Sequence, residues 1–138
     1  MDAVSGLPLV RGFMEEHGLN DGFSLTCAFS ITMWIHLNHG DDGLKHFVQL
    51  AATLTATSGA LVVEPQNYKS YRTALKRCRK RGIEPPPFCG DALHLRDIDA
   101  AVCDCLARDG NLVAVTHLGS EAWGRSLLLF SASCSNKR

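Results

Sequence analysis

The stretch SITMWIHLNHGDDGL, residues 30–44, separates two segments whose patterns predict a strand and a helix. Before it, the largely apolar run FSLTCAFSI, residues 23–31, predicts a buried β-strand. After it, apolar residues recur at helical spacing over about residues 43–57, which predicts an amphipathic helix with Asp41 or Asp42 at its N-cap. The polar and aromatic side chains of the stretch itself are therefore expected in a loop between strand and helix.

Strands and helices alternate through the rest of the chain. The other expected elements are a short helix over residues 8–17, a buried strand over 60–64, helices over 68–81 and 96–108, and strands over 111–118 and 125–132 that form a hairpin. This order predicts an α/β sheet with right-handed crossovers, in which ligands bind beyond the carboxyl ends of parallel strands. The loops that follow the first two strands are therefore expected to meet at one crevice.

Length and composition are those of one ordinary globular domain. The chain has 138 residues, of which 46% are apolar and 20% are charged. Its apolar runs are far shorter than the roughly 20 residues that a membrane-spanning helix needs. The N-terminal segment has no basic start and no sustained apolar core, so we expect no signal peptide and a location in the cytoplasm or nucleus.

The charges are unevenly distributed although the formal net charge is zero. Seven of the fourteen basic residues lie between residues 69 and 81, with no acid among them: Lys69, Arg72, Lys76, Arg77, Arg79, Lys80 and Arg81. This pattern predicts one basic helix on an acidic body. The helix begins at the second loop of the crevice, and a helix N-terminus with nearby cations suits an anionic group such as phosphate.

The six cysteines are most simply free thiols that act as small apolar side chains in a reducing compartment. An alternative is a zinc site built from Cys103, Cys105 and a histidine such as His94. Their spacing is not that of a structural zinc module, so no metal site is expected.

Three segments carry a family resemblance. They are S-I-T-M-W-I-H-L-N-H-G-D-D-G-L at residues 30–44, V-V-E-P-Q-x-x-K-x-Y at 62–71 and W-G-R-S-L-L-L-F at 123–130. Together they resemble the bicoid-interacting-protein type of RNA methyltransferase, over about residues 10–133. The match is nearest to the branch that methylates the 5′-monophosphate of transfer RNA and microRNA precursors.

The resemblance implies a partial Rossmann-like class I methyltransferase sheet of about four strands, with helices on its faces. Two strands would be parallel, residues 23–31 and 60–64, and a C-terminal hairpin would insert its last strand antiparallel next to the second of them. The implied methyl donor is S-adenosylmethionine, and the implied acceptor is a 5′-phosphate oxygen of RNA.

The Gly-rich donor-binding turn of this fold has no counterpart in the chain. We therefore expect residues 1–138 to form a single truncated domain, the acceptor-side half, which is inactive alone. A non-catalytic product or pseudoenzyme that at most binds RNA or a partner is the alternative. The first parallel strand would then be an exposed edge, open to self-association.

The resemblance also implies site residues. Catalytic candidates are His36 and Asn38, donor-binding candidates are Ser30 and Glu64, and substrate-binding candidates are Trp34, His36, Asn38, Tyr68, Lys69, Arg72 and Lys76. From the residues alone, Trp34 is expected in the core beside its apolar neighbours, and His36 is expected to be structural. Arg125 is expected to be structural and to close the rim of the cleft.

Overall fold

The computed structural model describes residues 7–84, 97–109, 112–120 and 125–132. Its elements, in chain order, are α1 (Leu7–Glu16), β1 (Phe23–Phe29), α2 (Thr32–Leu54), β2 (Thr55–Glu64), α3 (Tyr68–Lys80), α4 (Ile98–Asp109), β3 (Leu112–Ser120) and β4 (Ser126–Ala132). The expected α/β class is confirmed, as are the helices expected near residues 8–17, 68–81 and 96–108. No described helix is both long and apolar enough to cross a membrane.

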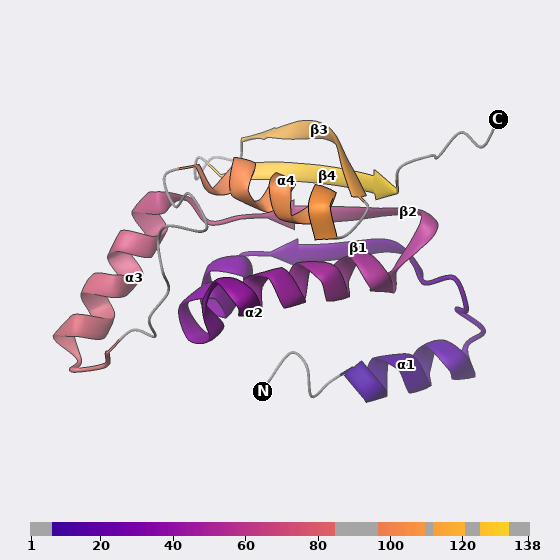
Figure 1. Cartoon of the computed structure of the whole chain (residues 1–138), viewed down its shortest axis with the longest axis horizontal. Helices are drawn as coiled ribbons and strands as arrows, with labels where there is room; N and C mark the ends of the chain where they lie inside the picture. The colour runs from indigo at the N-terminus through magenta and orange to yellow at the C-terminus, as the bar shows by residue number, and fades with distance from the viewer. Residues whose placement is uncertain (1–6, 85–96, 110–111, 121–124, 133–138) are drawn as a thin grey trace.

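The four strands form one sheet in the order β1-β2-β4-β3 (Figure 1). β1 and β2 are parallel, whereas β4 runs antiparallel to both β2 and β3. This confirms the predicted arrangement, in which two parallel strands are followed by a hairpin whose last strand inserts beside the second one. The topology is that of a partial Rossmann-like sheet.

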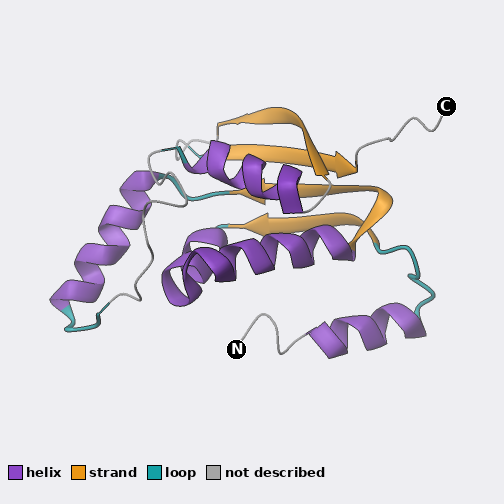
Figure 2. Cartoon of the chain, in the orientation of Figure 1, coloured by secondary structure: helices purple, strands orange, loops and turns teal. Residues whose placement is uncertain are grey.

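Helices α2 and α4 lie side by side on one face of the sheet, and α3 lies beyond the carboxyl ends of β1 and β2 (Figure 2). A single core cluster joins the covered face of the sheet to these three helices, with Leu61, Val63, Leu128 and Phe130 from the central strands at its centre. The helices expected to pack on the sheet are confirmed, and α2 and α4 share one face of it.

β1 is not the fully buried strand that its apolar composition predicts. Ala28 points into the core, whereas Leu25 and Phe29 on the opposite face are 59% and 54% exposed. Successive strand residues face opposite sides, and only the side under α2 is covered by described residues. β1 also has β2 as its single described neighbour, so it is an edge strand.

The loop predicted after β1 is wrong, because α2 begins at Thr32 and continues to Leu54. Gly40 interrupts it with φ 68° and ψ −168°, a left-handed kink that glycine adopts without steric cost. Asp41, expected at the N-cap, follows this kink within the helix. Its carboxylate instead accepts a hydrogen bond from His36.

The end of α2 also differs from the prediction of a helix to about residue 57. The helix stops at Leu54, and β2 starts at Thr55. The Thr55 hydroxyl lies within hydrogen-bond distance of two acceptors, the carbonyl oxygen of Ala51 and the Thr26 hydroxyl. Gly59 lies inside β2 rather than after a helix. A Cβ atom there would stand 2.7 Å from the carbonyl oxygen of Phe23, so only glycine allows this close approach of β1.

Candidate functional site

A cleft of about 560 Å³ opens beyond the carboxyl ends of β1 and β2. It lies between the first turn of α2, one face of α3 and the residue that precedes β4. Its lining consists of Ser30, Met33, Trp34, Gln66, Asn67, Lys69, Ser70, Thr73, Ala74, Arg77 and Arg125. The two strand-end segments and the start of the basic helix therefore converge on one cleft, where the sequence predicted that they would meet.

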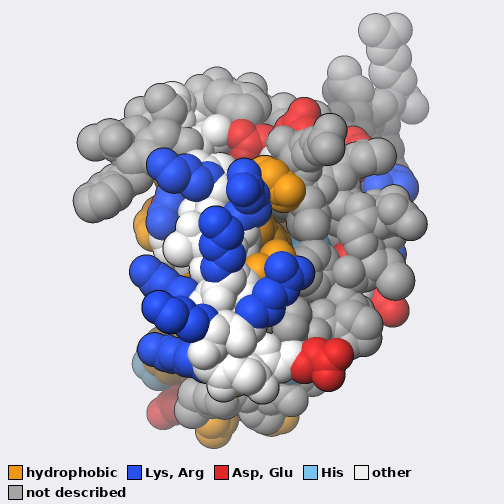
Figure 3. Space-filling view, turned by 90° about the vertical axis from the view of Figure 1, so that its left-hand side faces the viewer, with side chains coloured by type: hydrophobic (Ala, Val, Ile, Leu, Met, Phe, Trp, Pro, Cys, Tyr) orange, Lys and Arg blue, Asp and Glu red, His pale blue; other side chains and the backbone are white. Residues whose placement is uncertain are grey.

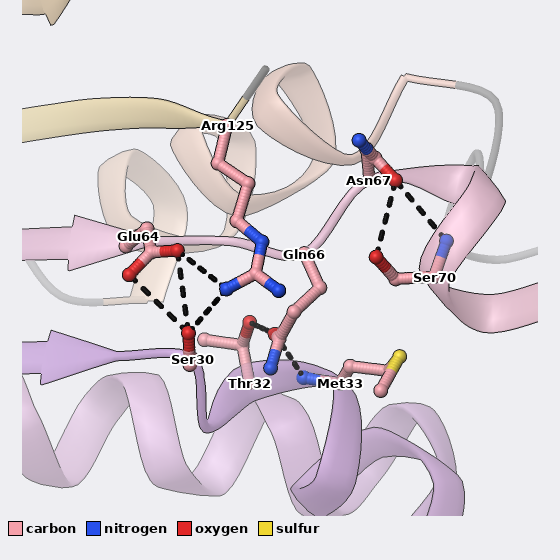
Figure 4. Close-up of polar contacts among 8 residues, drawn as sticks. All are labelled: Ser30, Thr32, Met33, Glu64, Gln66, Asn67, Ser70 and Arg125. Carbon is pink, nitrogen blue, oxygen red and sulfur yellow. Dashed lines mark hydrogen bonds and ion pairs between the residues drawn. The ribbon is translucent and has the colours of Figure 1, made fainter. Parts of the chain in front are cut away.

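Glu64, at the end of β2, ties three strand ends together (Figure 4). The Ser30 hydroxyl donates to its carboxylate, with distances of 3.2 and 3.3 Å to the two oxygens. Arg125 Nη1 donates to Glu64 Oε1 at 2.7 Å and also to Ser30 Oγ. Ser30 and Glu64, expected to bind a donor, are thus engaged with each other and with Arg125.

Gln66 provides the cap that α2 lacks in its own sequence. The N-cap residue of α2, Ile31, offers no capping side chain. Instead Gln66 Oε1 accepts hydrogen bonds from the Met33 amide at 2.9 Å and the Thr32 hydroxyl at 3.0 Å (Figure 4). This satisfies a backbone donor that the first helical turn leaves unpaired, and it fixes the start of α2 against the end of β2.

Asn67 caps α3 in the usual way, with its side-chain oxygen accepting from the Ser70 amide at 3.1 Å. Three of the four residues in the E-P-Q-N segment therefore fix the end of β1, the start of α2 and the start of α3, in that order: Glu64, Gln66 and Asn67. Both helix N-termini are held at the cleft, where their partial positive charges favour an anion.

One wall of the cleft is the basic helix α3. Ser70, Thr73 and Arg77 recur every three or four residues and share the cleft-facing side with Lys69. Lys and Arg side chains gather over this helix in the space-filling view (Figure 3). Lys69, Arg77 and Arg125 are the three cationic residues of the lining, and Glu64 is paired with the last of them.

The structure places three of the expected site residues in the cleft, namely Ser30, Trp34 and Lys69. Trp34 is 49% exposed, so the alternative that it fills the core is wrong. Arg72 lies over the ring of Tyr68, 5.9 Å from its centroid. Both of these side chains, like Lys76, are exposed on α3 without belonging to the lining.

His36 is the main correction to the predicted site. Its side chain is buried, 0% exposed, with Nδ1 3.0 Å from the Tyr71 hydroxyl and Nε2 2.6 Å from Asp41 Oδ1. Burial, and then the nearby Asp41 carboxylate, raise the pKa of Tyr71. His36 does not line the cleft, and its contact with Tyr71 joins α2 to α3.

Asn38, the second catalytic candidate, is exposed but is not part of the lining. Its side-chain amide donates to the carbonyl oxygen of Trp34 at 2.6 Å. Eight lining residues were not among the predicted site residues, and four of these eight carry a side-chain amide or a positive charge: Gln66, Asn67, Arg77 and Arg125. The E-P-Q-N segment directly after a predicted strand was the signal for the first two, and the contiguous basic run was the signal for Arg77.

No group of three metal-ligating side chains occurs among the described residues. Of the zinc alternative, His94 lies outside the described residues. Burial, and then the carboxylates of Asp99, Asp104 and Asp97, raise the pKa of the Cys103 thiol. A thiol must lose its proton to bind zinc, so this environment opposes the role.

The sheet and the position of the cleft define the class: a Rossmann-like α/β protein whose cleft lies beyond the carboxyl ends of parallel strands. Within that class, residues 23–131 match the family model described as Bicoid-interacting protein 3 (Bin3). The chain belongs to the Bin3 family, as its three motifs predicted.

Curated relatives carry methyltransferase names. The chain is 37% identical over 124 residues to the RNA 5′-monophosphate methyltransferase of Homo sapiens, which covers 90% of this chain and 41% of the relative. It is 34% identical over 130 residues to the pre-miRNA 5′-monophosphate methyltransferase of Xenopus laevis, covering 94% of this chain and 49% of the relative. The chain thus has a methyltransferase lineage and spans less than half the length of either relative.

Proposed function

We propose that this chain supplies the acceptor side of an S-adenosylmethionine-dependent RNA methyltransferase that acts on a 5′-phosphate. The relatives' names support the reaction, and the cleft supports the acceptor. The observation that carries the proposal is the convergence of Lys69, Arg77 and Arg125 with the exposed indole of Trp34 around one cleft. Cations bind phosphate, and an exposed aromatic ring can stack on an unpaired RNA base.

Methyl transfer to a phosphate oxygen depends mainly on the alignment of the methyl donor with the acceptor oxygen. In the transfer, a phosphate oxygen forms a bond to the methyl carbon as the bond between that carbon and the donor sulfonium breaks, which leaves S-adenosylhomocysteine. A phosphate oxygen is already anionic near pH 7, so no strong general base is required. The residues of this cleft would hold and orient the phosphate, and positioning of this kind can account for a large part of a rate enhancement.

The donor itself is proposed on family grounds. The polar atoms of Ser30 and Glu64, the two residues predicted to bind the donor, contact each other and Arg125. This engagement favours a second candidate function, a non-catalytic protein that binds RNA 5′-ends through the same cleft. Both candidates require the cleft to bind a 5′-phosphate, and they differ in methyl transfer.

Two measurements on the full chain test the proposal. The first is fluorescence anisotropy with a single-stranded 12-mer RNA that carries either a 5′-phosphate or a 5′-hydroxyl. Because hydrogen bonds to charged groups contribute about 1.5–3 kcal/mol, we expect roughly tenfold tighter binding of the phosphorylated RNA. Equal affinity for the two RNAs would contradict both candidate functions.

The second measurement is transfer of label from S-adenosylmethionine to the 5′-monophosphorylated RNA. Label transfer by the chain would establish that it is a methyltransferase. Preferential binding of the phosphorylated RNA without transfer shows that residues 1–138 do not catalyse the transfer alone, which is the result expected for an acceptor-side half.

We also propose that the chain self-associates through β1. This strand leaves one edge without a described neighbour, and its backbone donors and acceptors there can pair with another strand. Leu25 and Phe29 add exposed apolar surface beside the edge. Light scattering during size-exclusion chromatography is expected to show oligomers, whereas a monodisperse monomer across a hundredfold concentration range would contradict this proposal.

A further inference from the structure

Arg125 stands on the wall of the cleft opposite α3, immediately before β4. Its Nη1 nitrogen contacts Glu64 Oε1 and Ser30 Oγ, yet the same residue lines the cleft. Its side chain is half-buried, whereas Lys69 and Arg77 project from an exposed helix face. Among the cationic residues of the lining, Arg125 is the one whose contacts with described side chains fix its orientation.

The geometry of guanidinium makes this contact directional. The group is planar and carries five N–H donors in a rigid fork, so contacts made by one terminal nitrogen restrict where the other nitrogens can point. Nη1 makes both contacts with Glu64 and Ser30, and the other terminal nitrogen extends on the side of Gln66, another residue of the cleft (Figure 4). A planar fork of this kind matches the oxygens of a phosphate.

The positioning of Ser30 is itself constrained. Its φ of 55° lies in the left-handed region, which is uncommon for a serine and costs of order 1 kcal/mol or more. The Ser30 amide donates to the carbonyl oxygen of Glu64 at 3.3 Å, and its hydroxyl contacts the Glu64 carboxylate. The backbone and the side chain of Glu64 therefore both hold Ser30 in this conformation. Ser30 and Glu64 in turn accept hydrogen bonds from Arg125 and so restrict its orientation.

We propose that Arg125 binds the terminal 5′-phosphate of the RNA, and that Glu64 and Ser30 are positioning residues that aim its guanidinium into the cleft. This inference rests on the proposed function. It divides the cations of the cleft into two groups. Arg125 recognises the end of the RNA, whereas Lys69 and Arg77 on α3 attract the backbone without regard to the end.

The test is the ratio of dissociation constants for the 5′-hydroxyl and 5′-phosphorylated forms of the same 12-mer RNA. Arg125→Gln is expected to reduce a wild-type ratio of about ten to about one, because the fork that distinguishes the two ends is lost. Arg77→Gln is the matched control on the other wall. It is expected to weaken binding of both RNAs by the same factor and to leave the ratio unchanged.

Two further variants separate orientation from charge and from folding. Arg125→Lys keeps the charge but lacks the planar fork, and a ratio of about two to three is expected. Glu64→Gln keeps the shape of the side chain but removes the charge that fixes Arg125. It is expected to lower the ratio while the affinity for 5′-hydroxyl RNA changes less than twofold, a pattern that a purely structural role would not produce.

Circular dichroism and a thermal melt establish that each variant is folded. A folded Arg125→Gln or Arg125→Lys protein that keeps the wild-type ratio would overturn the assignment of Arg125 and leave the proposed function intact. A wild-type ratio of one would overturn the proposed function and this inference with it.

Discussion

Replacing Gln66 with methionine is expected to destabilise the fold by removing the cap of α2. Gln66 is 2% exposed, and its Oε1 accepts from the Met33 amide and the Thr32 hydroxyl. Methionine has a similar length, so the substitution leaves little or no cavity. It cannot accept the two hydrogen bonds. The change therefore isolates the two hydrogen bonds.

The magnitude follows from those two bonds. A net hydrogen bond contributes about 0.5–1.5 kcal/mol, and a buried donor left without an acceptor costs about 1–3 kcal/mol. Loss of a helix N-cap alone costs about 0.5–2 kcal/mol, which overlaps with the first two contributions. A decrease of about 2–3 kcal/mol in the free energy of unfolding is therefore expected for Gln66→Met.

Urea denaturation followed by circular dichroism measures this free energy directly. Gln66→Glu is the matched control, since it keeps an acceptor at a helix N-terminus, where negative charge is favourable. It is expected to lose less stability than Gln66→Met. If Gln66→Met unfolds within 0.5 kcal/mol of the wild type, the role assigned to Gln66 is wrong.

Three further predictions concern charge, pH and association. Arg77→Gln is expected to reduce the slope of log K against log salt by about one, since it removes one phosphate contact, and an unchanged slope would place Arg77 outside the RNA path. The raised pKa of Tyr71 means that the folded chain holds this proton when the unfolded chain releases it near pH 10, so stability is full below pH 10 and declines as the pH rises above it. Absorbance at 295 nm, which follows tyrosine ionisation, should show an ionisation step well above pH 10 that Tyr71→Phe abolishes. If all tyrosine ionises in one step near pH 10, the burial of Tyr71 is contradicted. Leu25→Lys, which adds a charge beside the edge of β1, is expected to shift oligomers to monomer in light scattering, and unchanged oligomers would exclude that edge.

Much of the fold follows from local patterns. The parallel strands, the basic helix and the C-terminal hairpin are confirmed because each has a clear apolar period and a turn signal at its end. The start of α2 was predicted wrongly because Gly40 and two following aspartates resemble a helix boundary. Met33, Leu37, Leu44 and Val48 nevertheless continue one buried helical face across the kink.

The site was predictable in location but only partly in its residues. Strand order places the ends of β1 and β2 together, so the convergence of Trp34 and Lys69 followed from topology. The pairing of Glu64 with Arg125 joins residues 61 positions apart, and no local pattern indicates such a contact. The buried His36 has partners in the core residue Tyr71 and in the half-buried Asp41, and sequence spacing alone does not reveal that burial.

The most direct test of the central claim is an NMR titration of the isotope-labelled chain with a 5′-phosphorylated RNA trinucleotide, repeated with its 5′-hydroxyl form. If the cleft binds the 5′-phosphate, the phosphorylated RNA shifts the indole N–H signal of Trp34 and the backbone amide signals of Lys69 and Ser70, and the hydroxyl form shifts them less. Equal shifts with both RNAs, or shifts confined to residues remote from the cleft such as 44–54, would contradict a 5′-phosphate site at the carboxyl ends of β1 and β2.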